Sequence, residues 1–281
     1  MQARRLDGGR LHLHHGPIDV VLRVWGGADD VRMAEEAAMA RFRSILPDLV
    51  AELPLLRAPL GAAPRGVVAR RMHAACAPFA THGLFVTAMA AVAGAVADEL
   101  LAVMRDAAPG LARAFVNDGG DIAVFAAPGE SLVIGMAVDP RLAAFDGALR
   151  IRAGDGIGGI ATSGRHGRSF SLGIADAVTV LARDAAAADA AATLIANAVD
   201  IASPAITRAP ACSLDPDSDL GPRLVTTGVG PLAEAEIDAA LAAGAGRAES
   251  FRREGLIHAA ALRLAGRTRI LGAPSPLEPP R

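Results

Sequence analysis

Six strand-like segments follow one another with no helical segment between them, and this block constrains the fold more than any other feature of the sequence. The segments are Arg113–Val116, Ile122–Ala126, Leu132–Val138, Ala148–Arg152, Ile160–Ser163 and Ala177–Ala182. Doubly wound folds alternate strands with helices, whereas strands that follow one another directly tend to pair as antiparallel neighbours. The block therefore predicts an α+β fold with mixed or antiparallel sheets packed with alanine-rich helices.

Apolar periodicity and capping residues predict the elements around this block. We expect strands as a pair over Leu11–Trp25 and near Ile257–Leu264 and Thr268–Leu271. We expect helices over Asp29–Pro47, Ala88–Met104, Ala185–Val199 and near Leu232–Ala243, the second capped by Thr87 and the third by Asp184. The stretches from Pro47 to Cys76 and from Pro204 to Pro222 are predicted to be irregular. No composition shift divides the chain, so we expect a single domain over residues 1–281 with a loose Pro-rich tail from about residue 274.

Composition excludes several classes of function. All 28 cationic side chains are Arg and the chain has no Tyr, which removes Schiff-base chemistry, a phosphate-loop lysine and a Tyr nucleophile. A net charge of -2 without a basic stripe argues against nucleic acid as a partner. The sequence shows no secretory signal, no apolar run long enough to span a membrane, and two widely spaced Cys residues. We expect a soluble, cytoplasmic protein; the sequence does not indicate an oligomeric state.

The first motif with unusual chemistry is a polar turn between two strand-like segments. It contains Asn117, Gly119, Gly120 and Asp121. Two glycines permit positive φ angles, and successive N–H groups of such a turn can form an anion site. An ordinary β-hairpin is the alternative interpretation.

The second motif follows an apolar strand and is rich in groups that bind anions. It contains Thr162, Ser163, Gly164, Arg165, His166 and Arg168. Guanidinium groups match phosphate oxygens in pairs, and glycine lets the backbone come close to them. We interpret the segment as a phosphate-binding turn, with a solvated loop as the alternative.

The third motif lies on the alanine-rich helix. Asp189, Thr193 and Asn197 recur every four residues and therefore share one face, while the other faces are apolar. A buried carboxylate needs a partner, which here is an Arg, a set of N–H donors or a metal ion. A carboxylate and a hydroxyl one turn apart suit Mg²⁺, which prefers oxygen ligands.

Together these segments resemble the ApbE-like superfamily, and in particular an uncharacterised short cytoplasmic branch of it. The resemblance is carried by Val-Asn-x-Gly-Gly-Asp-Ile, Ala-Thr-Ser-Gly and Ala-Asp-Ala-x-Ala-Thr in this order, and by Val68–Met72, Met89–Asp98 and Leu214–Gly221. The superfamily includes Mg-dependent enzymes that take FMN from FAD and attach it to a Thr or Ser of a target protein. It implies an ApbE-like fold.

The resemblance also implies roles for individual residues. Asp189 and Thr193 match metal ligands, and Ala93 matches the residue whose carbonyl is a third ligand. Residues 117–121 and 162–164 match positions around the FAD site. The family's His-x-x-Asp-Pro-x-Thr-Gly segment is missing, and the corresponding interval is shortened to Arg165–Asp176.

These observations lead to one principal hypothesis and two alternatives. The principal one is an enzyme that binds Mg²⁺ and FAD or a related nucleotide-diphosphate cofactor, with the acceptor being a protein hydroxyl or water. Arg165 and Arg168 would hold phosphate oxygens, while Asp189 and His166 would take part in the reaction, His166 by proton transfer. The alternatives are a non-catalytic flavin or cofactor carrier, and an enzyme of another cofactor pathway on the same fold.

Overall fold

A nine-stranded antiparallel sheet forms the base of the molecule in the computed structural model, which describes residues 1–136 and 147–272. In spatial order its strands are β1 (Gln2–Leu6), β2 (Arg10–His15), β3 (Ile18–Trp25), β4 (Arg113–Asp118), β5 (Asp121–Ala126), β8 (Gly159–Ser163), β9 (Ala177–Ala182), β12 (Ala259–Leu264) and β13 (Arg267–Leu271). Two further pairs are β6 (Ser131–Met136) with β7 (Gly147–Arg152), and β10 (Ile206–Pro210) with β11 (Leu224–Val229). The α+β fold class is confirmed.

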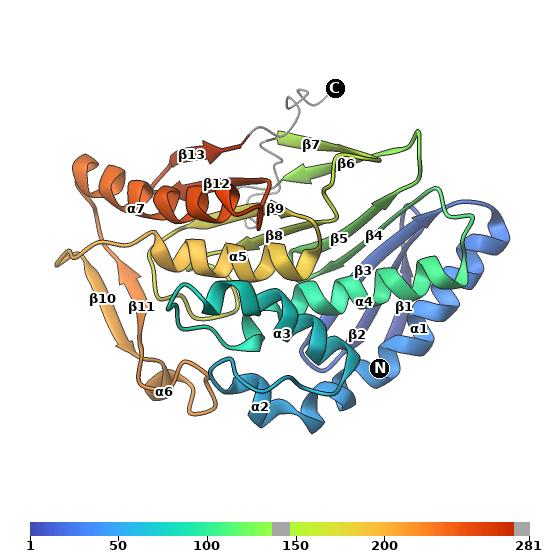
Figure 1. Cartoon of the computed structure of the whole chain (residues 1–281), viewed down its shortest axis with the longest axis horizontal. Coiled ribbons are helices and arrows are strands. Elements are labelled where there is room, and N and C mark those ends of the chain that lie inside the picture. The colour runs from blue at the N-terminus through green and yellow to red at the C-terminus, as the bar shows by residue number, and fades with distance from the viewer. Residues whose placement is uncertain (137–146, 273–281) are drawn as a thin grey trace.

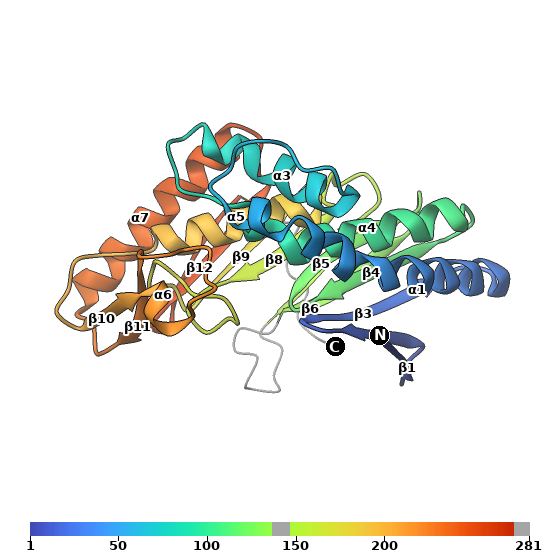
Figure 2. The same cartoon turned by 90° about the horizontal axis from the view of Figure 1, so that it is seen from below.

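The helices gather on one face of this sheet (Figures 1 and 2). They are α1 (Ala28–Ala51), α2 (Leu53–Arg57), α3 (Val67–Ala80), α4 (Val92–Ala107) after a 3₁₀ turn η1 (Ala88–Ala91), α5 (Ala185–Ala198), α6 (Ala211–Leu214) and α7 (Glu234–Arg253). Helix α5 contacts β8, β9, α4, α3 and α7, so it lies at the centre of the helical layer. Most residues of α5 are alanines, and their small side chains permit this close packing. The helix is buried because it is apolar on nearly every side.

The predicted strand block is present almost as expected, because alternation and turn residues are local signals. Asp184 is confirmed as the cap of α5, since its carboxylate accepts a hydrogen bond from the N–H of Ala187 at 2.7 Å. The predicted strand Leu132–Val138 is observed as far as Met136, and its last two residues lie outside the described part of the chain, as does the tail from about 274.

Several predicted boundaries were wrong. The first helix continues through Pro47 to Ala51, held by buried side chains such as Leu49 beyond the proline. Thr87 precedes η1 but does not cap it, because its hydroxyl donates to Asp219. The last helix continues to Arg253 instead of ending near residue 243.

Both segments predicted to be irregular contain regular structure. Helices α2 and α3 lie within residues 48–80, where Pro54 occupies the first turn of α2 and Gly66 precedes α3. Strand β10 and helix α6 lie within residues 204–222, and Pro210 ends the strand. In these places Pro and Gly mark the beginning or end of a helix or strand. From the sequence alone, such residues could not be distinguished from those of a loop.

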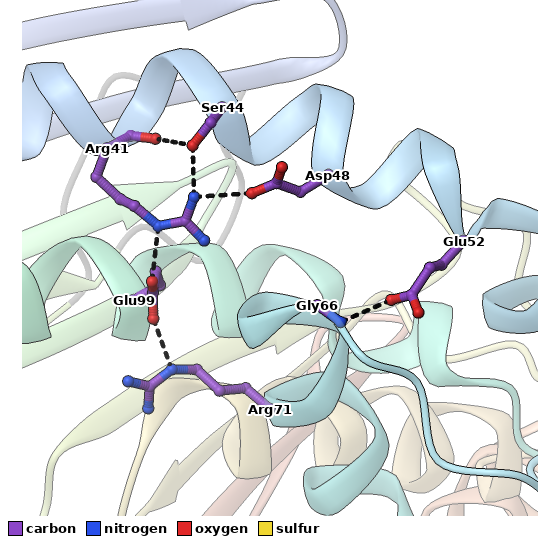
Figure 3. Close-up of polar contacts among 7 residues, drawn as sticks. All are labelled: Arg41, Ser44, Asp48, Glu52, Gly66, Arg71 and Glu99. Atoms are coloured by element: carbon purple, nitrogen blue, oxygen red, sulfur yellow. Dashed lines mark hydrogen bonds and ion pairs between the residues drawn. The ribbon is translucent and has the colours of Figure 1, made fainter.

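A buried ion network fastens α4 to α1 and α3 (Figure 3). Glu99 of α4 is 5% exposed and accepts from the Nε of Arg41 at 2.7 Å and from the Nε of Arg71 at 3.0 Å. Just after the C-terminal end of α1, Glu52 accepts from the backbone N–H of Gly66 at 2.8 Å and so fixes the start of α3. These contacts hold the outer helices on α4.

We expect Glu99→Ala to lower the free energy of unfolding by about 3 kcal/mol, because it leaves two guanidinium groups without their shared buried partner. Urea unfolding followed by circular dichroism measures the change. Glu36→Ala is the matched control, since the exposed pair of Glu36 with Arg32 on α1 should contribute less than about 1 kcal/mol. Equal losses in the two variants would contradict a structural role for the network.

Candidate functional site

The turn between β4 and β5 is a two-residue hairpin turn. Gly119 and Gly120 have φ angles of 65° and 114°, which a side chain would disfavour. The Oδ1 of Asn117 accepts from the N–H of Gly120 at 2.8 Å. The hairpin interpretation is confirmed. The N–H of Gly120 already has its hydrogen-bond acceptor within the turn, the side chain of Asn117.

Two aspartates flank this turn and face the helices. Asp118 and Asp121 are register partners, and Asp118 is 4% exposed. The Oδ1 of Asp118 accepts from the N–H of Asp19 at 3.4 Å, and the Oδ1 of Asp121 accepts from the N–H of Thr162 at 3.3 Å. Burial nevertheless raises the pKa of each carboxyl to about 7.

Asp189 of α5 lies above this pair. Burial, followed by the negative charge of Asp121, raises the pKa of Asp189 well above its ordinary value, and Asp118 adds to the effect. The Oδ2 of Asp189 accepts from the N–H of Gly94 at 3.1 Å, and the N–H of Ala93 also lowers its pKa. We call Asp118, Asp121 and Asp189 the carboxylate cluster, because their charges act on one another.

The partner of Asp189 is therefore a set of backbone N–H donors, one of the three possibilities that the sequence left open. Ala93 and Gly94 belong to the first turn of α4, whose N–H groups have no partner within the helix. Ala93 lies next to Asp189 as expected, but it directs its N–H there. The carbonyl of Ala93 stays a predicted metal ligand.

Helices α4 and α5 cap each other. While Asp189 of α5 accepts from the start of α4, Asp98 of α4 accepts from Ala185 and Ala186 at the start of α5, at 3.0 and 2.8 Å. Burial raises the pKa of Asp98 to about 7. A Cβ on Gly94 would lie 2.3 Å from the carbonyl oxygen of Ala185, so only glycine allows the two helix starts to meet this closely.

Arg168 is the positive side chain that acts on two of the three carboxylates. Its charge lowers the pKa of Asp118 and Asp121, against the larger effect of burial. One guanidinium nitrogen donates to the carbonyl of Pro17 at 3.4 Å, and another lies so close to Gly119 that a Cβ there would be 2.2 Å from it. Arg168 thus lies across the hairpin turn beside the carboxylate cluster.

Arg165 and His166 are oriented differently, because both contact Asp176. The Nε and one terminal nitrogen of Arg165 donate to the Oδ1 of Asp176 at 2.9 and 2.7 Å, and the Nε2 of His166 lies 3.3 Å from the same oxygen. The other carboxylate oxygen of Asp176 accepts from the N–H of Ala265. The backbone of Asp176 also packs on Gly164. Arg165 and His166 therefore already have a partner in the fold.

The hydroxyl groups of the predicted site separate into two sets. Thr162 is exposed, and its Oγ1 lies 2.9 Å from that of Thr179, while its N–H contacts the cluster through Asp121. The side chains of Ser163 and Thr193 form no hydrogen bond with other described residues. Thr193 is half-buried one turn after Asp189 and is available as an oxygen ligand next to the cluster.

Sequence reasoning included Asp118 and Asp98 in the segments that carry the family resemblance but gave neither residue a role of its own. Asp118 follows Phe115 and Val116 on a strand, so alternation alone places it on the same face as buried Val116. Asp98 lies four residues after Gly94 on an apolar helix, the same spacing that drew attention to Asp189. Both signals were present in the sequence, but neither says which N–H groups or charges lie opposite.

The donor atoms around the carboxylate cluster determine which kind of metal ion could bind there. Within residues 1–136 and 147–272, no three His, Cys, Asp or Glu side chains are arranged to hold a metal ion by themselves. Mg²⁺ does not need such a cage, because it keeps several waters and commonly binds one or two carboxylates together with phosphate oxygens. Asp189, Thr193 and Asp121 supply oxygen atoms of the right kind in a region with excess negative charge.

None of the helices in the described part of the chain has the length and apolar character needed to cross a bilayer.

Comparison with known proteins gives a family match over nearly the whole chain. A model of the family described as "AbpE bacteria" matches residues 3–270. Among curated proteins, the UPF0280 protein of Methanothrix thermoacetophila is 44% identical over 112 residues, which cover 40% of this chain and 45% of that protein. The UPF0280 protein of Methanopyrus kandleri is 44% identical over 134 residues, covering 46% of this chain and 48% of that protein. The chain thus matches less than half the length of these relatives.

A crystal structure of the ApbE protein of Thermotoga maritima superposes with a TM-score of 0.46 and 13% identity over 95% of this chain and 96% of that one.

Proposed function

The chain belongs to the family described as AbpE bacteria, within the ApbE-like superfamily, and on this premise we propose that the carboxylate cluster binds Mg²⁺ together with the pyrophosphate of FAD or a related nucleotide-diphosphate cofactor. The observation that carries the proposal is the meeting of Asp118, Asp121 and Asp189: burial raises the pKa of each, Asp118 adds to the rise for Asp121, and both add to the rise for Asp189. Several buried carboxylates with raised pKa values beside one another are typical of functional sites, and a cation would favour their ionised forms.

In this proposal each residue has a defined part. Asp189, Thr193 and Asp121 would hold the cation, while Arg168 would orient a phosphate oxygen at the hairpin turn. Mg²⁺, when bound, supplies positive charge that stabilises the negative charge on the leaving phosphate. In the reaction, the acceptor oxygen forms a bond to the phosphorus of the FMN half and loses its proton to solvent, while the pyrophosphate P–O bond breaks and AMP leaves.

Two outcomes of the same chemistry differ in the acceptor. A protein hydroxyl must be held in line with the pyrophosphate, and a misplacement of about 1 Å can lower the rate ~100-fold. Because the interval between residues 165 and 176 lacks the family's His-x-x-Asp-Pro segment, we expect water to react and a protein hydroxyl to react little. A carrier without turnover is the second candidate, favoured by the contacts of Arg165 and His166 with Asp176, which leave neither directed at the cluster.

Incubation with FAD, Mg²⁺ and a standard flavinylation target peptide tests these alternatives. We expect FMN and AMP by chromatography, with less than about one hundredth as much FMN on the peptide by mass measurement. Stoichiometric FMN on the peptide would overturn the expected acceptor. Binding of FAD without any product would favour the carrier, and no binding at all would contradict the proposal.

The cluster also predicts how Mg²⁺ affinity depends on pH. Burial raises the pKa of Asp121 from 3.8 to about 7, so a proton should compete with the cation below neutral pH. The affinity for Mg²⁺ should therefore rise by about tenfold per pH unit below pH 7 and level off above it. Calorimetric titration with Mg²⁺ at about pH 6, 7 and 8 measures this; equal affinity at all three would argue against the cluster as the binding site.

A further inference from the structure

A concave site lies away from the carboxylate cluster, with a volume of about 320 Å³. It is lined mainly by Val124, Leu132, Ile151, Arg152, Ile157 and Arg183. Val124 and Ala123 are consecutive on β5 and point to opposite faces of the sheet, Ala123 into the main core under the helices. The cavity is therefore on the far side of β5 from the helices, whereas Asp118 faces the helices among the carboxylates of the cluster.

The cavity is open to solvent, and its floor is apolar. Val124, Leu132 and Ile151 are 6%, 5% and 2% exposed and form a hydrophobic cluster separate from the main core. The volume is within the range of small-molecule sites. At the ~30 Å³ that a water molecule occupies in the liquid, it has room for about ten non-hydrogen atoms.

The rim carries positive charge and unused donors. The guanidinium of Arg152 has no partner among the described residues, and only the Nε of Arg183 is engaged, with Asp184 at 3.1 Å. Both side chains lie on exposed residues. The backbone N–H groups of Gly154 and Gly156, which also line the cavity, have no acceptor within residues 1–136 and 147–272. An apolar floor beneath such a rim complements a molecule with an apolar body and a negative end.

We propose that this cavity binds a small apolar molecule that ends in one anionic group, a carboxylate or a phosphate monoester. The apolar part would lie on Val124, Leu132 and Ile151, and the anion would take paired hydrogen bonds from Arg152 and Arg183. The site is separate from the proposed cofactor site, so its occupancy should not depend on Mg²⁺ or FAD.

Octanoate, which has ten non-hydrogen atoms by its formula, is the probe, and 1-octanol is its uncharged counterpart. By calorimetry we expect octanoate to bind one site about tenfold or more tightly than octanol, because only octanoate makes charge-assisted hydrogen bonds. The double variant Arg152→Gln/Arg183→Gln should bind both equally. Arg32→Gln, an exposed arginine on α1, is the control that should leave the difference intact.

Octyl phosphate distinguishes the two anions, since the tighter of octyl phosphate and octanoate identifies the class of the natural ligand. Ala126→Trp, at a half-buried lining position, should weaken all three molecules by filling the cavity, and circular dichroism verifies that each variant is folded. Equal binding of octanoate and octanol to the unmodified protein, no binding of either, or displacement of octanoate by FAD with Mg²⁺ would overturn the proposal.

Discussion

Gly94→Ala should unfold the protein or lower its free energy of unfolding by more than about 4 kcal/mol, at the exceptional end of single substitutions. The added Cβ would lie 2.3 Å from the carbonyl oxygen and 2.5 Å from the carbonyl carbon of Ala185. Both are backbone atoms at the start of α5, so no side chain can move aside. Helices α4 and α5 would have to separate, and the contacts of Asp189 and Asp98 with the opposite helix starts would be lost.

Gly246→Ala on α7 is the control for this variant. Gly246 is exposed and a Cβ there has nothing within 4 Å, so alanine should stabilise the helix by up to about 1 kcal/mol. Urea unfolding of both variants measures the effects. A Gly94→Ala protein as stable as the control would contradict the mutual capping of α4 and α5.

Asp189→Asn should weaken Mg²⁺ binding by at least ~100-fold while leaving the fold intact. The amide oxygen can still accept from the N–H of Gly94, so the start of α4 stays capped. The raised pKa of Asp189 means that its ionised form is unfavourable in the fold. The neutral variant should therefore be more stable than the unmodified protein at about pH 8 without Mg²⁺.

Asp106→Asn is the matched control, an exposed position on α4 that should change neither stability nor Mg²⁺ affinity appreciably. Calorimetry and thermal unfolding with and without Mg²⁺ compare the variants. If Asp189→Asn unfolds, or binds Mg²⁺ as well as the control, then Asp189 is a structural cap and the cation site is elsewhere.

Features encoded by neighbouring residues could be predicted from the sequence. The alternation of β4, β5 and β9 and the capping of α5 by Asp184 depend on contacts within a few residues, and the structure contains them. The burial of α5 also followed from its alanine content. By contrast, Pro54 and Gly66 lie at the starts of helices, whereas the sequence led us to expect an irregular segment there.

The candidate site was predictable only in part, because its chemistry depends on residues far apart in the chain. The sequence indicated that Asp189 needs a partner, yet Gly94 is 95 residues away. Arg165 and His166 had the composition of a phosphate site, but Asp176, brought close by the returning chain, satisfies both. Asp118 lay within the predicted 117–121 motif but received no role of its own, because the alternation along a strand fixes the face of a residue and not the charges opposite it.

Calorimetric titration of the unmodified protein with FAD, once with Mg²⁺ and once with chelator, is the most direct test of the central claim. If the carboxylate cluster holds Mg²⁺ against the pyrophosphate, FAD should bind at least about tenfold more tightly with Mg²⁺, and Asp189→Asn should remove the difference. Equal FAD affinity with Mg²⁺ and with chelator, or no binding under either condition, would contradict it.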